Sequence, residues 1–93
     1  MSFPAPDAVG YTVLTKRECL YCDKVKSLFE SKGINYKAVA CDDFLVGPDR
    51  EQFLDYVKRI TLLTTVRFPL VFHNACFVGG FVDTRDYIET ESW

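Results

Sequence analysis

The chain has 93 residues, of which 48% are hydrophobic and 26% charged, and its formal net charge is −2 at pH 7. This length suits one small domain with a single hydrophobic core, so we expect residues 1–93 to form one unit. The composition argues against disorder. The basic residues are scattered, which argues against nucleic acid as a partner. No apolar stretch approaches the roughly 20 residues of a membrane-spanning helix, so we expect no membrane partner.

The beginning of the chain carries no targeting signal of the secretory kind. The stretch MSFPAPDAVG contains neither a basic region nor an apolar run, both of which a secretory signal peptide has. We therefore expect a cytoplasmic protein. Stable structural disulfides are rare in that reducing compartment. The four cysteines then indicate catalysis, metal binding or buried thiols.

The first part of the chain predicts a strand, a helix and a second strand behind an extended lead-in over residues 1–9. The stretch GYTVLTK (10–16) has the β-branched and aromatic residues of a strand. Apolar residues then recur at helical spacing over 19–32, and Gly33 stands where a helix C-terminal cap places glycine. The alternation of apolar and polar residues in INYKAVAC (34–41) predicts the second strand.

The second part of the chain predicts a loop, a helix, a hairpin and a last helix. DDFLVGPDR (42–50) is typical of a loop, and its GPD end is typical of the start of a helix that extends to about Ile60. FPLVFHNACFVGG (68–80) predicts the two strands of a hairpin. VDTRDYIETE (82–91) predicts a short amphipathic helix.

The predicted order is β-α-β-α-β-β-α, which fits an α/β domain with helices on both faces of a four-stranded mixed sheet. Because a helix joins the first two strands, they should run parallel to each other. The strands of the hairpin must run antiparallel. This is the thioredoxin-like fold in its smallest form.

Two cysteines, Cys19 and Cys22, stand two residues apart where the first strand gives way to a helix. A thiol attacks a disulfide as its thiolate, so a redox cysteine needs its pKa lowered from about 8.5. The first turn of a helix supplies free N–H groups and the positive end of the helix dipole. We expect Cys19 to be the exposed nucleophile and Cys22 a more buried resolving thiol. Lys16 can add positive charge or bind a substrate carboxylate, while Glu18 should point into water.

A zinc site is the competing interpretation of the cysteine pair, with Cys41 and Cys76 as the other two ligands. Structural zinc sites bring their ligands in two close pairs, and here the other two cysteines are single and far apart. A Cys-X-X-Cys near a βαβ pattern favours redox chemistry, so we expect no metal. Cys41 and Cys76 have no assigned chemistry, and His73 has no catalytic role.

Three short motifs follow one another along the chain: K-x-x-C-x-Y-C over 16–22, F-P at 68–69 and G-G-x-x-D over 79–83. With these motifs on a matching element order, the stretch 11–87 resembles the glutaredoxins, the small dithiol members of the thioredoxin superfamily. The resemblance implies an oxidoreductase that reduces protein disulfides and protein–glutathione mixed disulfides. Glutathione is then the co-substrate and electron source.

The resemblance implies a role for each residue of the first motif. Cys19 is then the nucleophile and Cys22 the resolving thiol. Lys16 and Tyr21 should flank the bound glutathione. Leu20 departs from the family, which usually has proline after the first cysteine, and its presence should loosen the turn.

The two later motifs imply the remainder of the glutathione site. The backbone of Phe68 should pair with the tripeptide as an added strand does, and Pro69 should follow a cis peptide bond. Val82 and Asp83 should hold the γ-glutamyl end. Asp83, or else Thr84, should also be the N-cap of the last helix.

Residues 67–69 are Arg-Phe-Pro, where the family usually has Thr-Val-Pro. We expect Arg67 to bring a cation to the edge of the groove, where it could pair with a glutathione carboxylate. Leu20 and the GGF and RDY stretches are similar to phage and viral glutaredoxins. That similarity implies ribonucleotide reductase as a candidate protein partner.

Two further interpretations stay open. A thioredoxin-like reductant served by a flavoprotein reductase has the same fold, although the only tryptophan, Trp93, is far from the cysteines. Some glutaredoxins instead hold an iron–sulfur cluster between two protomers. Since the two thiols of one chain can close on each other, we expect a monomer without a cluster.

Overall fold

The computed structural model describes residues 3–91. Trp93 and the first two residues of the predicted lead-in lie outside these described residues. The order of the elements confirms the predicted β-α-β-α-β-β-α, with one additional short helix, α2. Their bounds are β1 Tyr11–Thr15, α1 Leu20–Ser31, β2 Tyr36–Ala40, α2 Asp42–Val46, α3 Arg50–Thr61, β3 Leu70–His73, β4 Cys76–Gly79 and α4 Phe81–Glu91.

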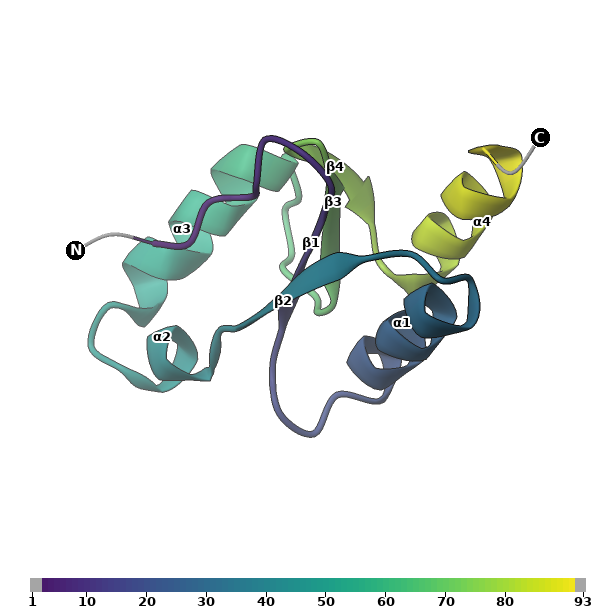
Figure 1. The fold of residues 1–93 in the computed structure, drawn as a ribbon. Coiled ribbons are helices and arrows are strands. Elements are labelled where there is room, and N and C mark those ends of the chain that lie inside the picture. The colour runs from purple at the N-terminus through teal and green to yellow at the C-terminus, as the bar shows by residue number, and fades with distance from the viewer. Residues whose placement is uncertain (1–2, 92–93) are drawn as a thin grey trace.

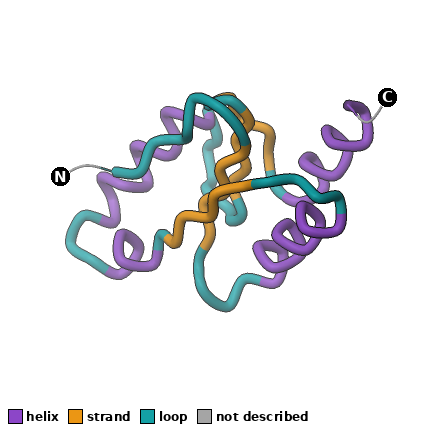
Figure 2. The backbone as a smooth tube through the Cα atoms, viewed as in Figure 1, coloured by secondary structure: helices purple, strands orange, loops and turns teal. Residues whose placement is uncertain are grey.

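The four strands form one mixed sheet, as predicted, and the structure gives their order as β2-β1-β3-β4. Strand β1 pairs in parallel with β2 and antiparallel with β3, and β3 pairs antiparallel with β4. The sheet separates two pairs of helices, with α2 and α3 on one side and α1 and α4 on the other (Figure 1). Figure 2 shows the strands passing between these two helical layers.

The central strands bury both of their faces, because successive side chains of a strand point to opposite sides of the sheet. Val13 and Val71 pack with Val25 and Phe29 in the core toward α1 and α4. On the other face, Leu14, Leu70 and Phe72 pack with Phe53 and Val57 of α3. Each such side chain contributes about 1.5–3 kcal/mol when it is fully buried.

Helix α1 ends as the sequence predicts. Gly33 has a positive φ of 68°, a conformation that costs glycine little. Its N–H donates to the Glu30 carbonyl oxygen at 3.2 Å, and the Ile34 N–H donates to the Phe29 carbonyl oxygen at 2.9 Å. This pair of bonds satisfies carbonyl groups that the last turn leaves without helical partners. The chain therefore turns from α1 into β2 at Gly33.

The expectation that residues 42–50 form a loop is wrong for their first half, which is helix α2. The N–H groups of Phe44 and Leu45 both donate to the Cys41 carbonyl oxygen at 3.1 Å, and both side chains pack against the core on the α3 side. A five-residue helix is too short to show a period in the sequence, and its packing stabilises it. Helix α3 begins at Arg50, directly after the GPD stretch, whose Asp49 is the N-cap residue.

Helix α4 begins at Phe81, so the prediction that Asp83 or Thr84 is its N-cap is wrong. The Thr84 N–H donates to the carbonyl oxygen of Gly80 at 3.0 Å. The helix therefore starts directly after the glycine pair that ends β4, and Asp83 lies in its first turn.

The lead-in contains no helix or strand over residues 3–10 and lies over α3. The ring of Phe3 packs edge-on against Phe44 and Phe53, with ring centroids 5.6 Å and 5.4 Å apart. The hydroxyl of Tyr56 donates to the Pro4 carbonyl oxygen at 3.0 Å. The aromatic ring of Phe3 thus extends the α3-side core.

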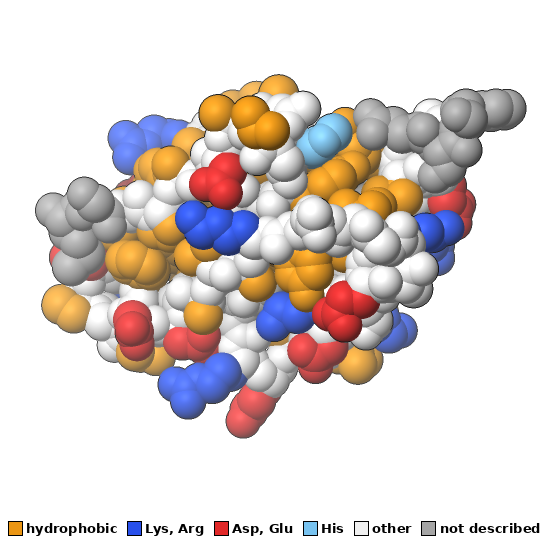
Figure 3. Space-filling view, in the orientation of Figure 1, with side chains coloured by type: hydrophobic (Ala, Val, Ile, Leu, Met, Phe, Trp, Pro, Cys, Tyr) orange, Lys and Arg blue, Asp and Glu red, His pale blue; other side chains and the backbone are white. Residues whose placement is uncertain are grey.

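The surface has no long run of one charge on the face that Figure 3 shows, where acidic and basic side chains alternate with apolar ones. No helix within residues 3–91 has both the length and the apolar character needed to cross a membrane.

Cys41 makes folding sensitive to alkaline pH. Burial, together with the smaller effect of the neighbouring Asp42 carboxylate, raises the pKa of its thiol from 9.0 to about 12. Between pH 9 and 12 the folded chain keeps this proton, while the unfolded chain releases it. The free energy of unfolding should therefore fall as pH rises through this window, by up to about 1.4 kcal/mol per pH unit.

Urea unfolding at pH 8–10 should show a steeper loss of stability for the native chain than for Cys41→Ala. Cys76→Ala is the matched control, because Cys76 is exposed, and its slope should equal that of the native chain. Equal slopes for the native chain and Cys41→Ala would contradict the prediction.

Candidate active site

Cys19 lies at the N-terminus of α1, where its own side chain caps the helix. Its backbone is extended, and its Sγ accepts a hydrogen bond from the Cys22 N–H at 3.2 Å. Cys19 and Cys22 are joined by a disulfide, and their Cα atoms are 5.2 Å apart. Cys22 is buried, as predicted, whereas Cys19 is half-buried rather than fully exposed. Cys19 is thus the more exposed residue of the pair.

Strand pairing brings a second segment to Cys19. Because β1 and β3 are antiparallel, with Leu14 opposite Leu70, the residues after β1 meet those before β3. The Phe68 carbonyl oxygen lies 3.7 Å from Cys19 Sγ. The peptide bond between Phe68 and Pro69 is cis, which confirms the predicted geometry.

A groove with a volume of about 440 Å³ runs from this point toward α4. We call it the Pro69 groove. It brings together five of the six residues that sequence reasoning assigned to glutathione, and Gly79, Gly80 and Arg67 also line it. Those five residues are Tyr21, Phe68, Pro69, Val82 and Asp83.

The sixth predicted residue, Lys16, does not line the Pro69 groove. It lies on the other side of Phe68, with its Nζ 5.9 Å from the centre of the Phe68 ring. Its side chain is exposed. A ligand in the Pro69 groove must therefore extend past Phe68 to meet Lys16.

Tyr21 and Phe81 form one wall of the Pro69 groove, and sequence reasoning missed Phe81 and its neighbour Lys24. Tyr21, which is 51% exposed, faces Phe81 with ring centroids 6.1 Å apart. The Nζ of Lys24 lies 5.0 Å from the Tyr21 ring centre and 5.9 Å from that of Phe81. Such contacts between a cation and aromatic rings are attractive. The i, i+3 spacing of Tyr21 and Lys24 was the available sequence signal, while the contact with Phe81 joins α1 to α4.

The glycine pair allows the backbone of β4 to approach α4 closely. Gly79 has a φ of 138°, and a methyl group at this position would collide with the Asp83 side chain. The Asp83 carboxylate remains exposed at the end of the groove. A side chain at residue 79 would displace this carboxylate.

The charged side chains around Cys19 carry both signs. Glu18 is exposed, as predicted, and has a φ of 52°. The Asp42 carboxylate accepts the Arg17 N–H at 2.9 Å and lies 3.5 Å from the Arg17 Nε. This hydrogen bond from the Arg17 backbone lowers the pKa of Asp42. Lys16 is exposed on the same side of the site.

The remaining cysteines and the histidine lie away from the disulfide. Cys41 is in the α3-side core, and Cys76 is exposed in β4. His73 stacks on Tyr11 at 4.2 Å between ring centres, and its Nδ1 lies 2.7 Å from the Tyr87 hydroxyl. Within residues 3–91, no three His, Cys, Asp or Glu side chains gather as a metal site requires.

A four-stranded mixed sheet flanked by helices, with a Cys-X-X-Cys at a helix start beside a cis-proline, defines a dithiol protein of the thioredoxin-like class. A family model for glutaredoxin matches residues 11–78. The chain is 38% identical over 73 residues to mitochondrial glutaredoxin-2 of Mus musculus, and 35% identical over 72 residues to chloroplastic glutaredoxin-C5 of Arabidopsis thaliana. The chain therefore belongs to the glutaredoxin family.

These matches cover 78% and 77% of the chain but only 44% and 39% of the two relatives, so the chain spans less than half of their length. Two solved structures are also similar. The buckwheat glutaredoxin–glutathione complex has a TM-score of 0.70 at 25% identity, covering 90% of this chain and 72% of that one. The holo form of poplar glutaredoxin C1 has a TM-score of 0.71 at 27% identity, covering 91% and 79%.

Replacing Gly79 should cost more stability than replacing a glycine with open surroundings. Gly79→Ala should lower the free energy of unfolding by at least about 2 kcal/mol, because it adds the collision with Asp83 to the cost of a positive φ. Gly33→Ala is the matched control, since Gly33 also has a positive φ but no atom within 4 Å of the added methyl. It should cost about 1 kcal/mol. Chemical denaturation of both variants checks this, and equal losses would contradict it.

Proposed function

We propose that this chain is a dithiol glutaredoxin, a thiol-disulfide oxidoreductase that draws electrons from glutathione. The observation that carries this proposal is the Cys19–Cys22 disulfide, in which the half-buried Cys19 lies 3.7 Å from the carbonyl oxygen of Phe68, a residue of the Pro69 groove. The similarity to a glutaredoxin solved as a glutathione complex supports it.

In the reduced state, the Cys19 sulfur would react as a thiolate. The Cys22 N–H already donates to this sulfur, and the N-terminus of α1 adds its positive dipole. The thiolate attacks the glutathione sulfur of a mixed disulfide, and the protein thiolate leaves and takes up a proton. A second glutathione thiolate then attacks the glutathione held on Cys19. Oxidised glutathione leaves, and the Cys19 thiolate is restored.

Protein disulfides would use both cysteines. Cys19 attacks one substrate sulfur, and the resulting mixed disulfide is broken by Cys22, which forms the internal disulfide and releases the reduced substrate. Two glutathione molecules then reduce that disulfide and leave as oxidised glutathione. The burial of Cys22 suits this role, because it keeps external disulfides away from the resolving thiol.

Glutathione would lie along the Pro69 groove in an extended form. The Phe68 backbone pairs with the tripeptide as a strand edge does. At the far end, the γ-glutamyl group lies against the first turn of α4, where N–H groups near Val82 bind its carboxylate and Asp83 accepts from its ammonium. Tyr21 flanks the peptide, and Lys16 pairs with a carboxylate beyond Phe68.

We further propose a cytoplasmic monomer without a resident metal. Ribonucleotide reductase is a candidate substrate on the resemblance to phage and viral glutaredoxins. The names of the curated relatives place those proteins in mitochondria and chloroplasts. Fractionation of the source cells and the mass of the purified chain in solution test these two points.

The two cysteines should respond differently to substitution. In an assay of glutathione-dependent reduction of a small glutathione mixed disulfide, Cys19→Ser should abolish turnover because the nucleophile is lost. Cys22→Ser should keep much of it, because this substrate needs only one protein thiol. A native chain without activity in this assay would overturn the proposal, and a thioredoxin-like reductant would then be the better interpretation.

Asp83 should contribute to glutathione affinity and not to chemistry. Asp83→Asn should raise the KM for glutathione about three- to tenfold, since a charge-assisted hydrogen bond to the ammonium is weakened. The matched control is Asp86→Asn, one turn further along α4 and outside the Pro69 groove, which should leave KM unchanged. Equal effects of the two variants would remove Asp83 from the binding site.

A further inference from the structure

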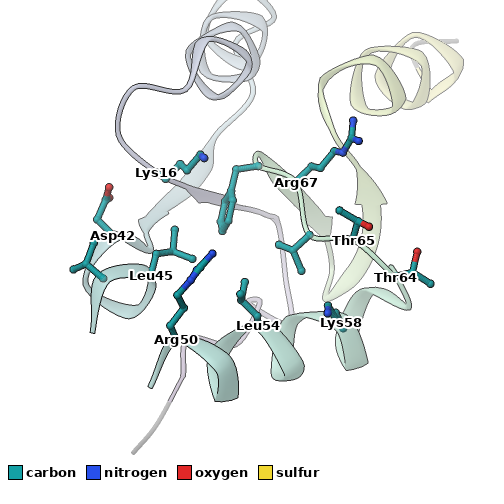
Figure 4. A pocket seen from close by; sticks show the side chains of 12 residues that line it. Lys16, Asp42, Leu45, Arg50, Leu54, Lys58, Thr64, Thr65 and Arg67 are labelled. Atoms are coloured by element: carbon teal, nitrogen blue, oxygen red, sulfur yellow. The ribbon is translucent and has the colours of Figure 1, made fainter. Parts of the chain in front are cut away.

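A second groove, of about 790 Å³, lies on the other side of Phe68 (Figure 4). It runs between α2, α3 and the segment that connects α3 to β3. We call it the cationic groove, because four basic side chains line it: Lys16, Arg50, Lys58 and Arg67. In Figure 4, Arg50 extends from α3 into the space below Lys16.

The positive charge of this groove is not compensated within the described part of the chain. All four basic side chains are exposed, and none of them is in an ion pair among residues 3–91. The single carboxylate of the lining, Asp42, is already held by Arg17. The chain as a whole has a net charge of −2. A local excess of positive charge on such a chain favours an anionic ligand.

The floor of the groove is apolar, which favours a peptide over a bare phosphate or a nucleic acid backbone. Leu45, Leu54 and Val66 are half-buried there and belong to the α3-side core. Val46, at the rim, is 81% exposed. A mixed surface of this kind suits a segment with acidic side chains and an apolar stem.

The cationic groove is linked to the disulfide through Phe68. Phe68 and Arg67 line both grooves, and the Phe68 carbonyl oxygen is 3.7 Å from Cys19 Sγ. A protein bonded to Cys19 through its own cysteine can therefore lay its neighbouring residues into the groove. An extended segment covers about 3.3 Å per residue, so a few residues suffice.

We propose that the cationic groove binds an acidic segment beside the target cysteine of a protein substrate. This inference rests on the proposed glutaredoxin function and adds to it a sequence preference. Small glutathione disulfides have no such segment, so their turnover does not depend on Arg50 or Lys58. Electrostatic attraction here raises the rate of productive encounter with acidic substrates.

The test uses two kinds of glutathionylated peptide. One carries four glutamates on one side of the cysteine, and its match carries four glutamines in the same positions. Each pair is made twice, once with the four residues before the cysteine and once with them after it, since a segment can enter the groove in either direction. At low salt, the native chain should show about fivefold higher kcat/KM for the better glutamate peptide than for its glutamine match. The preference should shrink as salt is added.

Charge reversal assigns the preference to the groove. Arg50→Glu and Lys58→Glu should each lower the glutamate preference by about twofold or more, and together they should abolish it. The control is Arg59→Glu on the same helix, which makes the same change of charge outside the groove lining and should keep the preference. Arg50 and Lys58 are both exposed, and a glutamate at residue 50 suits the N-terminus of α3. The charge-reversal variants should therefore fold.

A small glutathione mixed disulfide separates the proposed glutaredoxin function from the groove inference. All variants should turn this substrate over equally, because it has no acidic segment. If the native chain reduces it but treats both peptides alike, the groove inference fails and the glutaredoxin function stands. If the native chain reduces none of the substrates, both fail. An equal loss of preference in Arg59→Glu, or an oligonucleotide that binds the native chain but not Arg50→Glu, would also overturn the inference.

Discussion

The antiparallel register of β1 against β3 is the constraint on which the site depends. Leu14 faces Leu70, so the segment from the end of β1 to Cys19, with three residues in between, meets the two residues that precede β3. The register of β3 with β4 places Gly79 opposite Val71 and brings the start of α4 to the same edge. A one-residue slip would turn the core face of β1 toward the other layer. The burial of both faces of β1 therefore also fixes the position of the disulfide.

Helix α1 couples this sheet to the chemistry of Cys19. Val25 and Phe29 hold the helix against Val13 in the sheet, which aims its N-terminus at the loop after β1. Cys19 then caps the helix with its own sulfur, which accepts the N–H of Cys22. The donor that would stabilise a thiolate is thus part of the helix start. The N-terminus of α1 also supplies positive electrostatic potential at this sulfur.

Phe68 divides the surface around the disulfide into two grooves with different lining. The Pro69 groove on one side offers backbone, aromatic rings and the Asp83 carboxylate, which suits a small peptide with an ammonium group. The cationic groove on the other side offers four basic side chains over an apolar floor. Phe68 lines both grooves, and its carbonyl oxygen lies 3.7 Å from Cys19 Sγ. With such a surface, a glutaredoxin can bind its electron donor in the Pro69 groove and a protein substrate in the cationic groove.

The sequence by itself determined the order of the main elements, the end of α1 at Gly33 and the pairing of Cys19 with Cys22, because periodicity, glycine conformation and Cys-X-X-Cys spacing are local properties. The family motif also predicted the cis bond before Pro69. Only the tertiary structure decided that residues 42–46 are helical, that α4 starts at Phe81 and that Lys16 lies across Phe68 from the Pro69 groove. These features depend on contacts between segments far apart in the chain, and such contacts leave no local pattern.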